Sequence, residues 1–298
     1  MPHNLSDSNS NVEKKNAQFP SWLKRQIAHS GKQNSILENI HSSGLHTVCV
    51  EAKCPNRSEC YSKGTATFLI LGNTCTRFCT FCGVNHGDPE AVDLDEPAKV
   101  VDAVKSLKLN HVVITSVTRD DLSDGGASVY SETITQIRKS LPDVTIEILI
   151  PDFKGDHRAL EKVISVKPDI FNHNIETVPR LYSEVRPQAL YERSLQVLSI
   201  AANGGLRVKS GIMVGLGETI EEVQQVMKDV YATGCRIMTI GQYLQPSKNQ
   251  TSVKEFITPD QFGLYEEFGN ELGFSSVFAG PFIRSSYMAE KIFRDVQH

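Results

Sequence analysis

The chain alternates between short apolar segments, rich in β-branched residues, and longer segments in which apolar residues recur every three or four positions. The short segments predict β-strands at residues 66–71, 111–117, 144–150, 169–176, 207–214 and 236–244. The longer segments predict helices at about 97–109, 127–140, 156–166, 189–203, 218–233 and 259–272. In the clearest of these helices Val223, Met227 and Val230 share one face. Six alternations of strand and helix favour βαβ units and a parallel sheet.

Polar residues follow each predicted strand, and their distribution separates two architectures. They are Asn73 to Cys82, Arg119 to Asp121, Asp152, Asn172 to Glu176, Gly215 to Glu218, and Gln242 to Ser247. An open Rossmann-like sheet would concentrate such residues at one switch point, whereas a barrel spreads them around its carboxyl-terminal rim. We therefore predict an α/β fold with a partial (β/α)6 barrel of the TIM type, flanked by N-terminal and C-terminal extensions.

The barrel pattern and the polar first residues divide the chain into four parts. Residues 1–20 are predicted to be a disordered N-terminal arm, and residues 21–64 an N-terminal extension. Within that extension a helix is expected after Leu23 through about Ile40, and the stretch from Cys49 to Cys60 is expected to be a loop. Residues 65–274 are the predicted barrel core, and residues 275–298 a C-terminal segment.

Composition and charge narrow the range of partners. Of the 298 residues 40% are hydrophobic, which is enough for a substantial core, and the formal net charge is −4. No dense run of Lys or Arg is present, so nucleic acid is not an expected partner. No apolar run approaches the roughly 18 residues of a membrane helix, and the first residues lack the apolar region of a signal peptide. We expect a cytoplasmic protein that binds neither nucleic acid nor membranes.

Three cysteines lie together just after the first predicted strand. They are Cys75, Cys79 and Cys82, separated by three and two residues. Thiolates on one short loop can face a common centre. A structural zinc ion or an electron-carrying iron–sulfur cluster usually takes four protein ligands. A set of three therefore leaves one metal position open for another molecule.

A second group of three cysteines precedes that loop, at Cys49, Cys54 and Cys60. A disulfide framework would explain six cysteines, but disulfide-dense chains are usually short and secreted. Zinc is a second alternative, although zinc sites prefer paired Cys-x-x-Cys units and only Cys79 and Cys82 have that spacing. We favour two iron–sulfur clusters. The seventh cysteine, Cys235, is expected to be a small packing residue.

The pattern Cys-x-x-x-Cys-x-aromatic-Cys at the end of the first strand of a β/α repeat resembles the radical S-adenosylmethionine (SAM) superfamily. The resemblance implies that Cys75, Cys79 and Cys82 hold three irons of a [4Fe–4S] cluster. It implies that the amino and carboxylate groups of SAM chelate the fourth iron, and that Phe81 lies against the adenine.

Two glycine-containing turns extend this resemblance. Gly125-Gly126 resembles the superfamily's Gly-Gly-Glu segment, which meets the methionyl amino group of SAM, although Ala127 replaces the glutamate. The stretch that ends in Gly215-Leu-Gly-Glu218 resembles the motif after strand five, which lies near the adenine. The alternative for this stretch is an ordinary strand-to-helix turn with Glu218 at the helix start.

The end of the fourth predicted strand supplies further candidates for contact with SAM. Asn172, Asn174 and Glu176 are candidates to hold the ribose hydroxyls. The alternative is a polar strand end that meets water. Because side chains alternate along a strand, His173 is expected on the opposite face and is not proposed as a ligand.

Within the superfamily the chain resembles the lipoyl synthase family. The resemblance rests on the upstream triad of Cys49, Cys54 and Cys60, on Arg284-Ser-Ser-Tyr287, and on matching stretches from Trp22 to Ala289. It implies a sulfurtransferase that inserts two sulfur atoms at C6 and C8 of a protein-bound octanoyl-lysine. Those C–H bonds have no adjacent carbonyl to acidify them, so general acid–base chemistry cannot break them and a radical is required.

The same resemblance implies further cofactors and partners. The upstream triad would hold an auxiliary [4Fe–4S] cluster that donates the sulfur, with Ser286 as the fourth ligand. An alkoxide is a harder ligand than a thiolate and matches iron–sulfur chemistry less well. The implied partners are octanoylated lipoyl carrier domains of 2-oxoacid dehydrogenase complexes or the glycine cleavage H protein, an electron donor and an iron–sulfur carrier.

Two rival functions remain at this point. A sulfur-inserting enzyme of the biotin synthase kind shares the SAM triad but lacks the upstream triad and the Arg-Ser-Ser-Tyr stretch. A non-catalytic two-cluster electron carrier would need four protein ligands on each cluster and no room for SAM.

Counting iron and sulfide, combined with an assay of SAM cleavage, separates the radical enzyme from the electron carrier. We expect the anaerobically purified chain to carry two [4Fe–4S] clusters and, after reduction, to cleave SAM to 5′-deoxyadenosine. An electron carrier would show clusters and no 5′-deoxyadenosine. One cluster per chain, or zinc in place of iron, would contradict the assignment of the two cysteine triads.

Overall fold

A curved sheet of parallel strands forms the centre of the molecule in the computed structural model, which describes residues 19–24, 36, 38, 40, 42–63, 65–287 and 289. Its strands are β1 (His46–Thr47), β2 (Thr67–Ile70), β5 (His111–Ser116), β6 (Thr145–Leu149), β7 (Ile170–Asn172), β8 (Val208–Val214), β9 (Ile237–Gln242) and β10 (Ser276–Gly280). They are ordered β1-β2-β5-β6-β7-β8-β9-β10. β1 is antiparallel to β2, and every later pairing in this sheet is parallel. A separate small sheet pairs β3 (Thr74–Cys75) with β4 (Asn85–His86).

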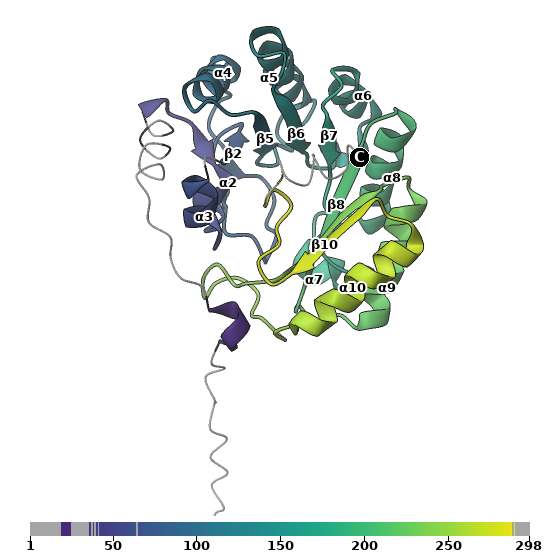
Figure 1. Cartoon of the computed structure of the whole chain (residues 1–298). Coiled ribbons are helices and arrows are strands. Elements are labelled where there is room, and N and C mark those ends of the chain that lie inside the picture. The colour runs from purple at the N-terminus through teal and green to yellow at the C-terminus, as the bar shows by residue number, and fades with distance from the viewer. Residues whose placement is uncertain are drawn as a thin grey trace, which may run out of the picture.

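Helices cover the convex side of this sheet (Figure 1). The six larger ones are α4 (Glu96–Ser106), α5 (Ala127–Ser140), α6 (His157–Ser165), α8 (Tyr191–Asn203), α9 (Ile220–Ala232) and α10 (Pro259–Leu272). Shorter helices are η1 (Ser21–Leu23), α2 (Val48–Glu51), α3 (Arg57–Ser62), η2 (Phe153–Gly155), η3 (Pro179–Leu181) and α7 (Tyr182–Val185). No helix in the described part of the chain is long and apolar enough to cross a membrane. The predicted α/β architecture of a partial (β/α)6 barrel is confirmed.

Local sequence chemistry explains where the larger helices begin. The hydroxyl of Thr219 accepts a hydrogen bond from the backbone N–H of Glu222, and the Glu222 carboxylate accepts one from the backbone N–H of Thr219. This capping box starts α9. Asp156 caps α6 in the same role, and Thr258 followed by a proline starts α10. The apolar faces of these helices pack on strands that are buried on both sides, such as β2.

Three details differ from the sequence-based expectations. The stretch from Cys49 to Cys60, expected to be a loop, begins in helix α2 and ends in helix α3. The fourth core strand stops at Asn172 instead of continuing to Glu176, because the chain turns there and Glu176, with a φ of +70°, pairs only through one bridge to β8. Strand β10, which was not predicted, extends the sheet beside β9. The predicted disordered arm and most of the helix expected through Ile40 lie outside the described residues.

A buried ion pair lies inside the barrel, near the amino-terminal ends of its strands. Lys209 Nζ donates to Glu147 Oε1 at 2.8 Å, and neither side chain has any exposed surface. His111 Nε2 lies 3.6 Å from the other carboxylate oxygen of Glu147. Burial alone would raise the pKa of Glu147, but its interactions with Lys209 and His111 together outweigh burial and the pKa is lowered. Glu147 is therefore ionised, and its buried negative charge is compensated by Lys209.

Replacing Lys209 with methionine removes that partner and leaves an uncompensated buried carboxylate. We expect the Lys209→Met substitution to lower the free energy of unfolding by about 3–5 kcal/mol, measured by chemical denaturation. The matched control is Lys99→Met, which breaks a pair with Asp93 whose side chains are 40% and 46% exposed, and it should leave the free energy of unfolding nearly unchanged because water screens the pair. Adding Glu147→Leu to Lys209→Met should recover most of the loss. Equal effects of the two single substitutions would contradict this reading.

Candidate functional site

The loop that carries Cys75, Cys79 and Cys82 begins where β2 ends. Leu71 adopts a φ of +67° there, and its backbone N–H donates to the buried carboxylate of Glu96 at 2.7 Å. β3 then brings Cys75 to the carboxyl end of the barrel. The sulfur of Cys75 accepts hydrogen bonds from the backbone N–H groups of Arg77 at 3.4 Å and Thr118 at 3.3 Å. These two hydrogen bonds fix the position of the Cys75 sulfur within the loop.

The three loop cysteines line a cavity of about 230 Å³ at the mouth of the barrel. The cavity wall includes Phe81 from the same loop and His173, Asn174, Glu176 and Arg186 from beyond β7. Burial raises the pKa of the Cys82 thiol to about 12 and also raises that of Cys79. These thiols are neutral in the metal-free protein, so they lose protons when they bind a metal.

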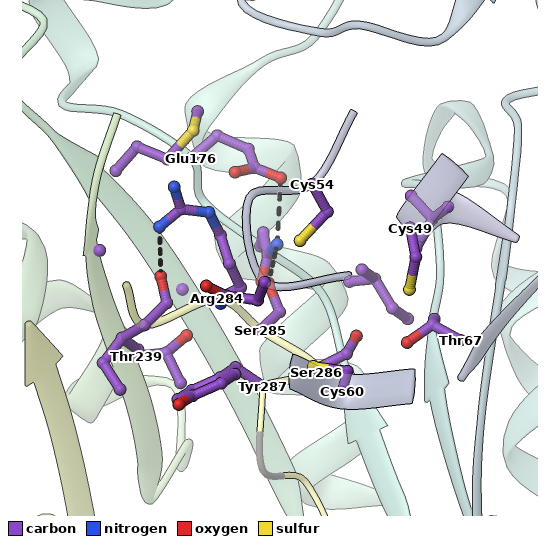
Figure 2. A pocket seen from close by; sticks show the side chains of 18 of the residues that line it. Cys49, Cys54, Cys60, Thr67, Glu176, Thr239, Arg284, Ser285, Ser286 and Tyr287 are labelled. Carbon is purple, nitrogen blue, oxygen red and sulfur yellow. Dashed lines mark hydrogen bonds between the residues drawn. The ribbon is translucent and has the colours of Figure 1, made fainter. Parts of the chain in front are cut away.

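The upstream cysteines line a second cavity, of about 220 Å³ (Figure 2). Cys49 comes from α2, Cys54 follows it in a turn closed by a hydrogen bond from its N–H to the carbonyl of Cys49, and Cys60 comes from α3. Burial raises the pKa of Cys49 to about 11 and that of Cys60 to about 12. The two short helices and the turn between them thus bring three thiols, from twelve consecutive residues, to one cavity.

Residues 281–287, a part of the C-terminal segment, also contribute to this second cavity. Ser285 and Ser286 both line it together with Arg284 and Tyr287, and Figure 2 shows Ser286 beside Cys60. Two long-range hydrogen bonds hold the segment against α3. Asn56 Nδ2 donates to the carbonyl of Phe282 at 2.6 Å, and the Tyr287 hydroxyl donates to Glu59 Oε1 at 2.9 Å. The chain's two extensions therefore build this cavity together.

The two cavities adjoin each other. Val48, Phe81, Leu149, Asn174 and Glu176 line both of them. The shared wall is mostly apolar, and its polar members, Asn174 and Glu176, come from the strained turn after β7. A molecule held at this wall is within reach of both groups of thiols. The arrangement can accommodate two separate metal centres with an apolar substrate between them.

The donor set fits iron–sulfur clusters better than the alternatives. All seven cysteines are free, so the disulfide framework is absent. Among the described residues no three Cys, His, Asp or Glu side chains are close enough to bind one metal ion. In a [4Fe–4S] cluster each thiolate binds a different iron, so its ligands stand further apart than those of zinc. Cys235 is fully buried, with its sulfur on the carbonyls of Val208 and Ile237, and cannot supply a fourth ligand to either triad.

The predicted contacts with SAM divide by position. A residue that contacts SAM has to line the first cavity, which holds Cys75, Cys79 and Cys82. Phe81, Asn174 and Glu176 line that cavity and also the second one. Asn172 is fully buried and lines neither cavity, so its position gives no support to that prediction. His173, expected on the opposite face, lines the first cavity because the strand ends before it and the alternation stops. Burial lowers its pKa to about 4, so it is neutral at pH 7.

The two glycine turns line neither cavity, and packing accounts for them. Gly126 has a φ of +91°, and a Cβ atom there would lie 2.2 Å from Leu71 Cδ1. A Cβ atom on Gly125 would lie 2.9 Å from the ring of Phe153. The carboxylate of Glu218 accepts from the backbone N–H groups of Gly215 and Leu216, as the alternative of an ordinary turn expects. The predicted roles of these residues toward SAM remain predictions.

Two buried arginines at the site were not singled out from the sequence. Arg186 Nη1 donates to the carbonyls of Asn174 and Ile175, each at 3.1 Å, and its Nε has no hydrogen-bond partner. It lies beside the first cavity, where it acts to lower the pKa of Glu176 against the effect of burial. Arg77 lies within the cysteine loop itself and pairs with two carboxylates. Neither arginine belongs to a run of charged residues or to a motif spacing that would mark it as functional in the sequence.

Comparisons with known proteins agree on one family. The family model of the radical SAM superfamily matches residues 69–230. A lipoyl synthase of Caldicellulosiruptor saccharolyticus is 52% identical over 274 residues, which cover 91% of this chain and 96% of that protein. A lipoyl synthase of Rubrobacter xylanophilus is 51% identical over 280 residues, covering 93% and 87%. Among solved structures, the [FeFe]-hydrogenase maturase HydG has a TM-score of 0.55 at 11% identity, over 89% of this chain and 66% of that one, and it shows a shared fold.

The close approach of the C-terminal segment to β9 requires a glycine. A Cβ atom on Gly241 would lie 2.2 Å from the carbonyl oxygen of Ile283. We expect Gly241→Ala to displace the segment at a cost of about 1–3 kcal/mol. Iron and sulfide should then be lost from the upstream triad, measured in a chain whose Cys75, Cys79 and Cys82 are alanine.

The matched control is Gly263→Ala on α10, where an added Cβ meets nothing within 4 Å. That substitution should leave iron binding unchanged and stabilise the helix by roughly 0.5–1 kcal/mol. Full iron retention in the Gly241→Ala protein would show that the segment does not complete the upstream site.

Proposed function

The chain belongs to the lipoyl synthase family of the radical SAM superfamily, and from that premise we propose which of its residues carry the reaction. As a member of this family it inserts two sulfur atoms at C6 and C8 of a protein-bound octanoyl-lysine, forming the lipoyl cofactor. It uses SAM and [4Fe–4S] clusters, and the sulfur comes from the auxiliary cluster. This activity excludes the non-catalytic electron carrier considered from the sequence.

Cys75, Cys79 and Cys82 are proposed to hold the cluster that binds SAM, with Phe81, Asn174 and Glu176 as protein contacts to SAM. The support for this proposal is that all six line one cavity. The three thiols leave one iron without a protein ligand, because Cys235 is buried elsewhere. When bound, the clusters and SAM supply the 5′-deoxyadenosyl radical that removes hydrogen atoms and the sulfide that replaces them.

The chain's own contribution to the chemistry is position and the exclusion of water. Val48, Phe81 and Leu149 make the wall between the cavities apolar, and Ile212 and Met213 of β8 extend it in the second cavity. An octanoyl chain has no polar group near C6 or C8, so only shape and apolar contact can hold those carbons in place. A closed apolar wall also keeps water from a radical that would attack the nearest bond.

The upstream triad is proposed to hold the auxiliary cluster, with Ser286 as its fourth ligand. Ser286 lines the same cavity as Cys49, Cys54 and Cys60, and Figure 2 shows it beside Cys60. The neighbouring Ser285 hydroxyl already accepts a hydrogen bond from Asn174 Nδ2 at 2.7 Å, which leaves Ser286 as the serine proposed for the metal. A serine oxygen is a harder ligand than a thiolate, so Ser286 would be the weakest of the four protein groups that hold this cluster.

The family's reaction requires a lipoyl carrier protein as substrate. We propose octanoylated domains of 2-oxoacid dehydrogenase complexes or the glycine cleavage H protein for that role. An electron donor and an iron–sulfur carrier are further proposed partners, because the reaction consumes electrons and the auxiliary cluster. The cytoplasm remains the location predicted from the sequence.

The observation that carries these assignments is the shared wall between two cavities, each lined by three free thiols. The test is mass spectrometry of an octanoyl-lysyl peptide after anaerobic incubation with reductant and SAM. The Ser286→Ala chain should still cleave SAM but form lipoyl product about a hundredfold more slowly. The matched variant, Ser285→Ala, keeps the proposed ligand and should retain most of the product. The reverse ranking of the two variants would move the ligand role to Ser285.

A further inference from the structure

One buried cation lies inside the cysteine loop and is joined to the barrel rim by two carboxylates. The Arg77 side chain is 4% exposed. Its Nε and Nη2 donate to the two oxygens of Asp120 at 2.7 and 3.0 Å, and Nη2 also donates to Asp152 Oδ1 at 2.7 Å. The guanidinium therefore makes a two-pronged contact with one carboxylate and a single contact with another.

The three residues of this network follow three neighbouring strands. Arg77 lies just after β3 in the loop that begins where β2 ends, Asp120 follows β5 and Asp152 follows β6. β2, β5 and β6 are adjacent in the large sheet. Asp152 has no exposed side-chain surface and accepts further hydrogen bonds from Arg193 Nη1 at 3.3 Å and from the backbone N–H of Lys154 at 3.0 Å. One side chain thus fixes the cysteine loop to two other strand ends.

The charge state of the network is settled by the pairing. An arginine guanidinium keeps its positive charge in proteins, and the contacts with Asp120 and Asp152 compensate that charge inside the protein. Burial opposes ionisation of Asp152, yet Arg77 lowers its pKa to about 2. Both groups are therefore charged at neutral pH. Buried ion pairs of this kind add little net stability compared with apolar packing, so stability alone does not explain the network.

The network also fixes a contact with a proposed iron ligand. The backbone N–H of Arg77 donates to the sulfur of Cys75 at 3.4 Å, and the N–H of Thr118 donates to the same sulfur at 3.3 Å. Thr76 joins the same region, because its N–H donates to the carbonyl of Thr118 at 3.0 Å and its hydroxyl accepts from the N–H of Asp120 at 3.0 Å. Hydrogen bonds to the sulfurs of a cluster raise its reduction potential.

We propose that Arg77 is a positioning residue for the reaction, which holds Cys75 and its two N–H donors in register on the barrel rim and so sets the position and the reduction potential of the SAM-binding cluster. Arg77 lines the first cavity outside the wall that the two cavities share, and it acts through Cys75, Asp120 and Asp152. The inference rests on the proposed function, in which Cys75 binds iron.

The first test uses the metal-free full-length chain and needs no cluster. Timed alkylation followed by mass spectrometry reports the exposure of each cysteine. In the Arg77→Lys chain, which keeps the charge and loses the two-pronged contact, Cys75 should be alkylated about tenfold faster. Cys54 should change less than about twofold, and the fully buried Cys235, which reports global unfolding, should stay protected. An unchanged rate at Cys75, or equal acceleration at all three cysteines, would overturn the proposal.

The matched control is Arg193→Lys, which alters the other arginine on Asp152 but lies on α8 outside the cysteine loop. It should leave the rate of alkylation at Cys75 unchanged. An effect equal to that of Arg77→Lys would show that the network only stabilises the fold and does not specifically hold Cys75. If Arg77→Lys does not fold, Asp152→Asn replaces it, because Arg77 then keeps its contact with Asp120. That variant should give a smaller acceleration at Cys75.

The second test uses the loaded enzyme. The midpoint potential of the cluster whose electron paramagnetic resonance signal responds to SAM should fall in the Arg77→Lys chain, because the N–H donors to Cys75 are displaced. The kcat of SAM cleavage should fall while the KM for SAM stays within about twofold. An unchanged potential contradicts the proposal. Failure of the unsubstituted chain to bind iron would instead overturn the proposed function, and the alkylation pattern would still decide the role of Arg77 as a loop anchor.

Discussion

Parallel strand pairing is the constraint on which the rest of the molecule depends. From β2 to β10 every strand in the large sheet runs in the same direction, so all carboxyl ends reach one rim. Each crossover must return through a helix on the convex side (Figure 1), which leaves the rim as the place where loops can carry chemistry. The two cysteine groups, the turn after β7 and the C-terminal segment meet there, although they come from distant parts of the chain.

This constraint explains why much of the fold and part of the site could be predicted from sequence. Strands and helices differ in the period of their apolar residues, so the six repeats were visible, and polar residues after each strand marked the rim. The spacing of Cys75, Cys79 and Cys82 is a local property of one loop, and the structure brings all three to one cavity. The same holds for the upstream triad, which spans only two short helices and the turn between them.

The remaining features depend on contacts that no local pattern encodes. The hydrogen bond from Asn174 to Ser285 joins residues 111 positions apart, and Asn56 meets Phe282 across 226 positions. β7 ends early because the chain turns before Glu176, whose backbone is strained. The argument from alternating side chains assumed a longer strand and therefore placed His173 on the wrong face. β10 is short and only partly buried, which leaves a weak apolar signal. Arg77 and Arg186 gain their roles from the carboxylates and carbonyls that surround them.

The contact between α3 and the C-terminal segment has a consequence for the order of assembly. The cavity around the upstream triad is closed by residues 281–287, which lie at the far end of the 298-residue chain. During synthesis on the ribosome, Cys49, Cys54 and Cys60 leave the exit tunnel more than two hundred residues before that segment does. Those thiols are therefore made long before the residues that line the same cavity with them. The cavity around the upstream triad cannot be completed until residues 283–287 have been synthesised, so a product that stops before them keeps the three thiols and lacks Ser286.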